Sequence, residues 1–236
     1  LRKIKRLPKL QFGHHKALSI LRKRMLPALF GVSVSQINLL VDTMIASTLI
    51  AGSVTWLYYS DRLLELPLAL IGIALATVAL AKLSNYHAKK DTKNFINTID
   101  KALLYAILLG LPACAGLVLL AEELIITLFQ YDAFDALSAK KTSLSLQAYS
   151  SGLMAFIAIK IFAPIFLSRG DTKTPVKAGV VAMVSNIVLN LIFVQYFDHV
   201  GLAIATSISA VINAAILYFF LIKQSIFRFH ITFYKM

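Results

Sequence analysis

Apolar residues in this sequence occur in long runs separated by short polar stretches. Six such runs cover about residues 26–50, 53–81, 101–121, 143–168, 176–196 and 202–222. Each run is close to the roughly 20 apolar residues with which a helix crosses a bilayer. Because an open sheet cannot satisfy its backbone in lipid, every run is predicted to be helical. The pattern predicts an all-α, polytopic membrane protein with a six-helix transmembrane bundle over residues 26–224.

The distribution of basic residues predicts how the bundle is oriented. Of the 24 lysines and arginines, 20 fall within residues 1–24, 82–101, 169–177 or 223–235, at one end of the predicted runs. Only Lys140 and Lys141 fall on the opposite side. By the positive-inside rule, both ends of the chain are expected in the cytoplasm. Residues 1–25 are predicted to form a basic interfacial segment on an anionic leaflet, and residues 225–236 a cytoplasmic tail or truncated link.

Composition supports a membrane protein and argues against several other classes. Hydrophobic residues make up 58% of the chain and charged residues only 15%, against about 25% charged in soluble domains. The net charge of +13 comes from clusters between apolar runs, so no nucleic-acid partner is expected. The single cysteine, Cys114, is interpreted as a packing residue. No phosphate-cradling loop, Cys/His metal spacing or nucleophile elbow occurs, and the chain is predicted not to be an enzyme.

The second apolar run contains an unusual group of charges. Asp61, Arg62 and Glu65 are spaced to share one helical face, with Tyr58 one turn earlier. Charges at membrane depth are costly, so these should face a protein interior or a wet cavity. Pro67 follows and is expected to loosen the helix there. A buried structural ion pair between helices is the alternative interpretation.

Polar residues in other runs are expected at related positions. The turn between runs one and two is so short that Asp42 and Asp61 should both lie about 12–13 Å below the outer surface. Asn186 and Asn190 form an i, i+4 pair in run five, and Thr206 begins a polar stripe in run six, although interhelical hydrogen bonds would also explain them. Lys160 in run four either snorkels to the membrane surface or supplies a second cation to an anionic substrate.

Three motifs carry a family resemblance. Residues 31–38 (GVSVSQIN), 52–67 (GSVTWLYYSDRLLELP) and 171–177 (DTKTPVK) resemble the MurJ (MviN) lipid II flippases, and the similarity extends over about residues 10–228. That family belongs to the multidrug/oligosaccharidyl-lipid/polysaccharide exporter superfamily and has fourteen helices, in two six-helix lobes and a further pair. The resemblance implies that this chain is a fragment that covers the second lobe, helices seven to twelve. A missing N-terminal lobe of the same protein is then its expected partner, in keeping with the abrupt start at Leu1.

The resemblance also implies a function. The family moves lipid II, the undecaprenyl-diphosphate-linked peptidoglycan precursor, from the cytoplasmic to the periplasmic leaflet of the bacterial inner membrane by alternating access, for cell wall biogenesis. Its essential charged group corresponds to Asp61, Arg62 and Glu65, with Tyr58 and Lys160 as further candidates for substrate binding. Arg62 would bind the diphosphate in bidentate geometry, held by Asp61 and Glu65. Export of another polyprenyl-linked saccharide or a drug, or an enzyme acting on polyprenyl-phosphate lipids, are the alternatives.

Some relatives have a sodium site, and its positions fall on Asp42, Asn186, Asn190 and Thr206. Oxygen ligands from three helices suit a hard cation. The sequence departs from the family pattern at Asn190, where an acid is expected, and this lowers the charge of the site. A structural polar cluster is the alternative, and no cofactor other than sodium is expected.

Overall fold

The structure is a computed structural model that describes residue 33 and residues 36–224. Predictions for the basic segment 1–25, for Gly31 and Ser35 in the first run, and for the tail 225–236 lie outside the described residues.

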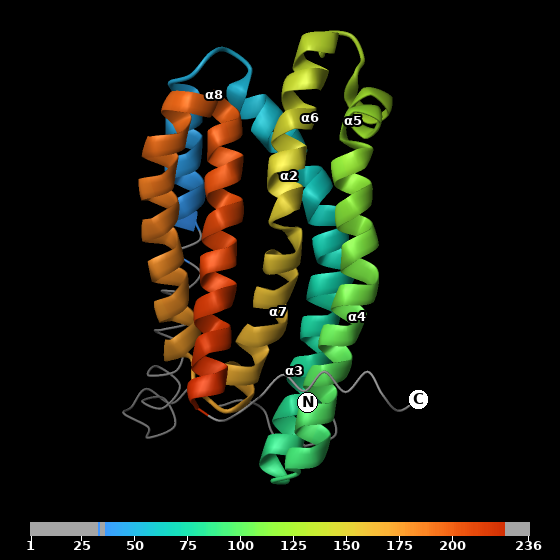
Figure 1. Ribbon diagram of the computed structural model, residues 1–236, viewed down its shortest axis with the longest axis vertical. Coiled ribbons are helices and arrows are strands. Elements are labelled where there is room, and N and C mark those ends of the chain that lie inside the picture. The colour runs from blue at the N-terminus through green and yellow to red at the C-terminus, as the bar shows by residue number, and fades with distance from the viewer. Residues whose placement is uncertain (1–32, 34–35, 225–236) are drawn as a thin grey trace, which may run out of the picture.

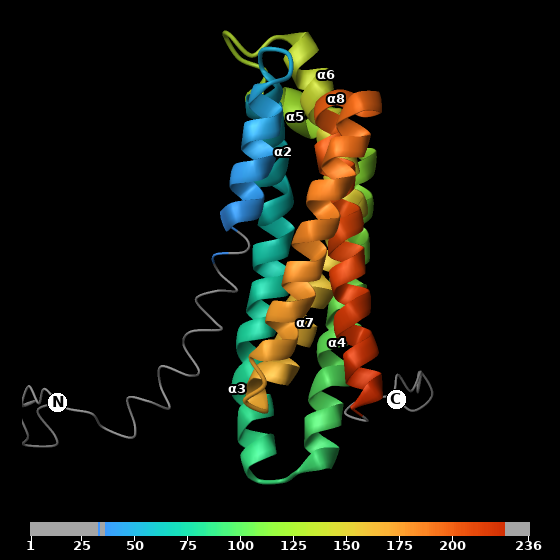
Figure 2. The same ribbon diagram turned by 90° about the vertical axis from the view of Figure 1, so that its left-hand side faces the viewer.

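The described chain is helical almost throughout and contains no strand (Figure 1). Residues 36–47 form the first helix, which lies beside α2 in Figure 2. The helices that follow are α2 (Ser53–Pro67), the π-helical segment η2 (Leu68–Ile73), α3 (Ala74–Ala88), α4 (Thr92–Leu119), α5 (Ala121–Phe129), α6 (Ala136–Ser151), α7 (Leu153–Ser168) and α8 (Lys173–Lys223). The segments α2, η2 and α3 follow one another without a gap and form a single pass along the bundle. The predicted all-α class is confirmed.

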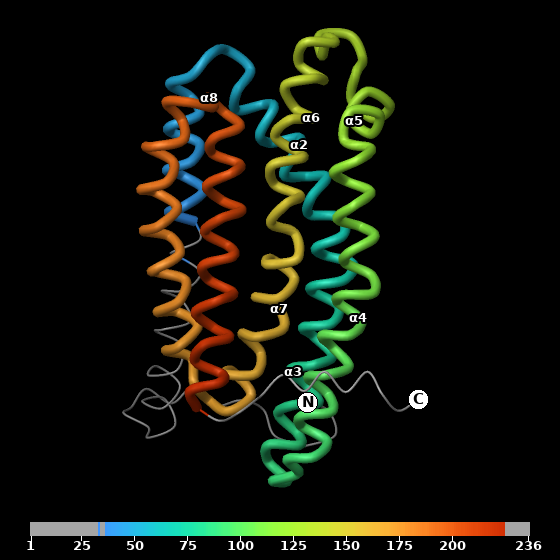
Figure 3. Tube along the Cα trace, viewed as in Figure 1, coloured from blue at the N-terminus to red at the C-terminus, as the bar shows by residue number. Residues whose placement is uncertain are grey.

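The 51-residue helix α8 contains two of the predicted spans. Its backbone breaks at Asp198, where φ is 50° and ψ is −133°. Asn186 and Thr206 lie 3.1 Å apart across a hydrogen bond, although 20 residues of straight helix would separate them by about 30 Å. The chain therefore turns back on itself at Asp198, as Figure 3 shows. Gly201 permits the tight return, because a Cβ there would lie 2.4 Å from the carbonyl oxygen of Phe193.

The fourth predicted span is bent rather than straight. It consists of α6 and α7, which meet at Gly152 with an angle of 43°. Ser53–Ala88, Thr92–Leu119 and Lys173–Lys223 are each long and apolar enough to cross a membrane, and the bent pair supplies one more candidate span. In the most apolar window of Thr92–Leu119 only 22% of residues are buried inside the protein, so most of its apolar side chains face outward, as lipid-facing residues do.

Two stretches between the predicted runs are largely helical. The acidic stretch 122–135 contains most of helix α5, in which Ala121 and Ile125 are completely buried. The acidic residues interrupt the apolar pattern of this helix, although its apolar face packs against α6. The basic stretch 85–100 is also helical except for a turn at residues 89–91, because Asp91 caps α4 by accepting a hydrogen bond from the backbone of Asn94 at 3.1 Å.

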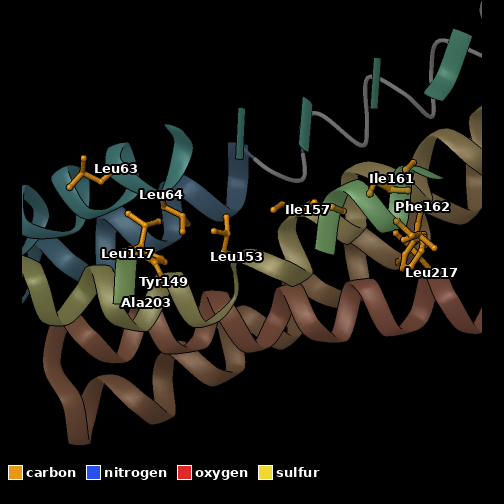
Figure 4. Close-up of a cluster of buried hydrophobic side chains, with 14 of the residues drawn as sticks. Leu63, Leu64, Leu117, Tyr149, Leu153, Ile157, Ile161, Phe162, Ala203 and Leu217 are labelled. Atoms are coloured by element: carbon orange, nitrogen blue, oxygen red, sulfur yellow. The ribbon is translucent and has the colours of Figure 1, made fainter. Parts of the chain in front are cut away.

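A continuous apolar core runs the length of the bundle, where α6 and α7 lie between α2–α3 and α8 (Figure 4). It includes Leu63, Leu64, Leu117, Tyr149, Leu153, Ile157, Ile161, Phe162, Ala203 and Leu217. Polar contacts reinforce it: Ser60 of α2 donates to the carbonyl oxygen of Trp56 and to that of Thr142 on α6, the latter at 3.3 Å. Cys114 packs partly buried and its thiol donates to the carbonyl oxygen of Ser150. The Ser60 contact holds α2, which carries the charged group, against α6, and the Cys114 contact joins α4 to α6.

Candidate functional site

Three of the predicted substrate-binding residues form one exposed cluster on α2. Nη1 of Arg62 lies 2.6 Å from Oε2 of Glu65, and both side chains are about half exposed, at 53% and 51%. The guanidinium carbon of Arg62 lies 4.8 Å from the centroid of the Tyr58 ring. A carboxylate on one side and an aromatic face on the other therefore restrain the guanidinium. Its exposure leaves other donors of the planar group available to an anion.

Asp61 precedes Arg62 on α2 and is half-buried, whereas the side chains of the cluster are exposed. It is three residues after Tyr58 and four before Glu65, and these spacings place side chains on one helical face. In the described part of the chain Arg62 forms an ion pair with Glu65, and no ion pair joins it to Asp61. Asp61 interacts electrostatically with Glu65 and Arg62 of its own helix and with Asp42 of the first helix. That both acids hold Arg62 stays a prediction: Glu65 forms the ion pair, and Asp61 attracts the guanidinium without one.

The four predicted cation ligands meet in one interhelical cluster. Nδ2 of Asn190 donates to Oδ1 of Asp42 at 2.5 Å and to Oδ1 of Asn186 at 2.9 Å. The amide of Asn186 lies 3.1 Å from the hydroxyl of Thr206, which donates to the carbonyl oxygen of Leu202. Residues from the first helix and from both halves of α8 therefore converge, and Asn186 and Asn190 are almost fully buried.

The orientation of the Asn186 amide decides what this cluster can bind. One terminal atom of the amide lies 3.0 Å from Oδ1 of Asn38 and 3.1 Å from Oδ1 of Asp42, and the other lies 3.1 Å from the Thr206 hydroxyl. If nitrogen faces the first helix, it donates to both oxygens and the cluster is held by hydrogen bonds alone. If oxygen faces it, three side-chain oxygens converge, so nitrogen is the better-satisfied orientation unless a cation lies between these oxygens.

The donor set fits a monovalent cation better than a divalent one. Asp42 is the only carboxylate in the cluster, and the other donors are amides and a hydroxyl. Oδ1 of Asn190 is buried and has no hydrogen-bond partner in the described part of the chain, which leaves one oxygen available for coordination. Among the described residues no group of three or more His, Cys, Asp or Glu side chains could hold a metal ion. Hard oxygen donors with a single negative charge are compatible with sodium.

Lys160 does not join the arginine cluster. It is exposed on α7, and its aliphatic stem packs beside η2, where a Cβ on Gly72 would lie 3.4 Å from its Cγ. Gly72 is ten residues after Arg62, which corresponds to about 15 Å along a helix. Lys160 is thus a separate cationic position beside the π-helical segment that follows Pro67.

The structure adds two residues to the site. Nδ2 of Asn38 donates to Oδ2 of Asp42 at 3.2 Å, one turn earlier on the same helix. Asn38 is the last residue of the motif 31–38, so the sequence carried a signal for it. Tyr149 of α6 is buried and interacts electrostatically with both Asp42 and Asp61. Its place depends on how α6 packs on α2, and no local pattern in the sequence indicates it.

Comparison with known proteins decides the family. The family model for "Lipid II flippase MurJ" matches residues 1–235. The chain belongs to the MurJ family. Over 90% of its length it is 52% identical to a probable lipid II flippase MurJ of Vibrio cholerae, of which it covers 40%. The chain thus spans less than half the length of the curated MurJ relatives it matches.

Solved structures agree with the MurJ assignment. A lipid II flippase MurJ in an inward closed conformation matches 90% of the chain with a TM-score of 0.78 and 31% identity, and 45% of that structure is covered. An outward-facing multidrug resistance MATE transporter of the MOP superfamily matches 95% of the chain with a TM-score of 0.79. Its identity is 18%, so this likeness shows a shared fold alone. The predicted family is confirmed.

Proposed function

We propose that this chain is part of a flippase that moves lipid II, the lipid-linked peptidoglycan precursor, across the bacterial inner membrane. The observation that carries the proposal is the exposed Arg62, restrained by Glu65 and Tyr58 on a helix that otherwise reads as a membrane span. Membership of the MurJ family supplies the cargo. Lipid II carries a diphosphate, whose oxygens match the planar guanidinium.

The chemistry of Arg62 suits repeated binding and release. A guanidinium keeps its proton at any physiological pH, so its affinity for an anion does not depend on proton transfer. Glu65 competes with a diphosphate for the same donors, because it already accepts from Nη1. The diphosphate replaces the Glu65 carboxylate at Arg62 when the head group binds, and Glu65 replaces the diphosphate when it leaves. The head group is therefore bound without being trapped. Lys160 of α7 provides a second cation beside η2, the segment that continues α2.

We further propose that the basic ends of the helices face the cytoplasm. The turn between α3 and α4 and the turn between α7 and α8 carry Lys89, Lys90, Lys93 and Arg169, while Lys140 and Lys141 lie toward the other end. This asymmetry supports inner-membrane insertion with both chain ends inside. The chain is then the second of two lobes, and transport proceeds as the lobes rock about the charged site.

The cluster around Asp42 is proposed to hold sodium. A bound sodium ion would neutralise Asp42 and tie the first helix to both halves of α8. The four side chains Asp42, Asn186, Asn190 and Thr206 would hold it, with Asn38 restraining Asp42 through its hydrogen bond. The buried, unpartnered Oδ1 of Asn190 supports this assignment. Ion binding at this point would bias how the first helix packs against the two halves of α8.

Complementation tests the role of Arg62. In the full-length protein, Arg62→Ala should fail to rescue cells depleted of their own flippase, and Arg62→Lys should also fail if bidentate contact with the diphosphate is required. Lys101→Ala removes an exposed cation from α4 and should rescue normally. Membrane abundance of each variant is measured alongside. Rescue by Arg62→Ala at the level of Lys101→Ala would show that Arg62 does not bind the cargo.

Thermal stability tests the cation separately. Sodium chloride, compared with choline chloride at equal ionic strength, should raise the melting temperature of the purified full-length protein. Asp42→Ala should abolish the difference, whereas Asp135→Ala, which removes a carboxylate at the start of α6, should preserve it. Equal melting temperatures in the two salts would leave the cluster a purely structural network.

A further inference from the structure

A cavity of about 320 Å³ lies far from Arg62, at the end of the bundle that carries the basic turns. It forms where α7 and α8 end beside the α3–α4 hairpin, which extends past them in Figure 2. The volume far exceeds the roughly 10–15 Å³ that one water needs. Its lining residues are Tyr86, His87, Lys90, Asp91, Thr92, Phe95, Arg169 and Gln224. Three separate segments of the chain therefore build its wall.

The two cations in this wall are not neutralised by its one carboxylate. Asp91 bonds to Asn94 through both carboxylate oxygens, at 3.1 and 2.6 Å. These bonds from Asn94, with Lys89 and Lys93 nearby, hold the pKa of Asp91 below its usual range. Within the described residues Asp91 forms no ion pair with Lys90 or Arg169. Both cations remain available to an external anion.

The remaining wall is amphipathic. The ring of Phe95 is buried and lies 6.4 Å, centroid to centroid, from the ring of His87. Tyr86 is half-buried beside them, and Gln224 contributes an amide from the end of α8. Cationic and amide donors next to aromatic carbon suit a phosphate that is attached to an apolar or glycerol-like group. Basic pockets between transmembrane helices are a known setting for anionic lipid head groups.

We propose that this cavity binds a phosphate group of an anionic ligand, with Lys90 and Arg169 as its charged donors and Gln224 as a neutral one. The phosphate belongs to a membrane phospholipid, since the cavity lies at the end of membrane-spanning helices and includes aromatic rings. Binding joins the α3–α4 hairpin to the ends of α7 and α8, and so steadies one end of the bundle. The site is separate from Arg62 and does not depend on which cargo is transported.

The backbone at Lys90 offers a variant that separates binding from folding. Lys90 has a φ of 56°, and the amide of Asp91 donates back to the carbonyl oxygen of Tyr86, which ends α3 in a turn where glycine is favoured. Lys90→Gly therefore removes the cation and introduces a residue that readily adopts the positive φ of this turn. A loss of ligand binding in this variant cannot come from damage to the hairpin.

The experiment measures binding to the purified full-length protein. Phosphatidylglycerol, phosphatidylcholine and glycerol 3-phosphate are titrated into protein in a neutral detergent, and the shift in melting temperature gives an apparent Kd. We expect phosphatidylglycerol to bind. Lys90→Gly and Arg169→Gln should each weaken binding about tenfold, as loss of one charge-assisted hydrogen bond implies. Lys177→Gln removes a cation from the same end that does not line the cavity, and should bind as the parent does.

Each outcome decides the proposal. If glycerol 3-phosphate binds as tightly as phosphatidylglycerol and is weakened by the same variants, the phosphate site stands but its lipid source is wrong. If phosphatidylcholine is as effective as phosphatidylglycerol, the charge argument is overturned. If Lys90→Gly and Arg169→Gln bind phosphatidylglycerol as well as Lys177→Gln does, the cavity is not the site.

Discussion

Close helix packing at glycine makes a graded prediction for stability. A Cβ added at Gly152, between α6 and α7, would lie 2.8 Å from Cα of Ser207 on α8. That contact is with backbone, which cannot rotate away, so the helices must separate. Ser207 also donates to the carbonyl oxygen of Ala148 at 2.7 Å, and separation would stretch this bond. Overpacking of this kind costs about 2–3 kcal/mol.

Three other glycines calibrate the effect. At Gly110 the nearest atom is the flexible Sδ of Met154 at 2.9 Å, so Gly110→Ala should cost only about 1 kcal/mol. At Gly116 and Gly179 nothing in the described structure lies within 4 Å of the added carbon. Alanine there should be neutral or stabilise the helix by up to about 1 kcal/mol, because glycine is the poorer helix former. The four sites differ in surroundings while the chemical change is the same.

Thermal unfolding of the full-length protein in detergent provides the assay. For a domain of this size 1 kcal/mol corresponds to about 2–4 °C, so Gly152→Ala should lower the melting temperature by about 4–12 °C. Gly110→Ala should fall between it and the two controls. If Gly152→Ala melts at the temperature of Gly116→Ala, the close approach of α8 to the α6–α7 junction is wrong. The order of the variants is the sharper test, since it does not depend on the conversion factor.

Three further predictions follow from the site and the turns. Asn190→Asp adds a second carboxylate to the cluster around Asp42. It should tighten sodium binding about tenfold, as one added charged ligand implies, and a sodium-dependent melting assay measures this. Unchanged affinity would place Asn190 outside the coordination shell. Although partial burial of Asp171 acts in the opposite direction, hydrogen bonds from Thr174 and Lys173 hold its pKa below the usual range. The ionised carboxylate therefore stabilises the turn above the unfolded pKa, near 3.9, and this stability is lost as the pH falls through the lower folded pKa. The difference in melting temperature between the parent and Asp171→Ala should shrink in acid. A difference that stays constant would contradict this account. Asn38→Ala should lower sodium affinity without altering rescue by much, since it removes a restraint on Asp42 rather than a charged ligand.

Much of the fold follows from local features of the sequence. Apolar runs of the right length predicted the helical passes, and the charged group in residues 52–67 identified the MurJ family. The i, i+3 spacing of Arg62 and Glu65 predicted their contact, because neighbours on one helical turn are fixed by helix geometry alone. The short turn between the first helix and α2 likewise predicted that Asp42 and Asp61 lie at one depth, and the two carboxylates interact in the structure.

Tertiary packing decided the rest. The approach of Asp42 to Asp61 depends on which side of α2 the first helix occupies, and the sequence period does not contain that information. The contact of Asn190 with Asp42 joins residues 148 positions apart, and Tyr149 approaches the two acids only because α6 packs on α2. Helix α5 was missed because its acids outweigh a buried apolar face that needs α6 to cover it. Local sequence determines helices and depth, since both depend on neighbouring residues and on the bilayer, whereas sites built from several helices depend on how their faces fit together.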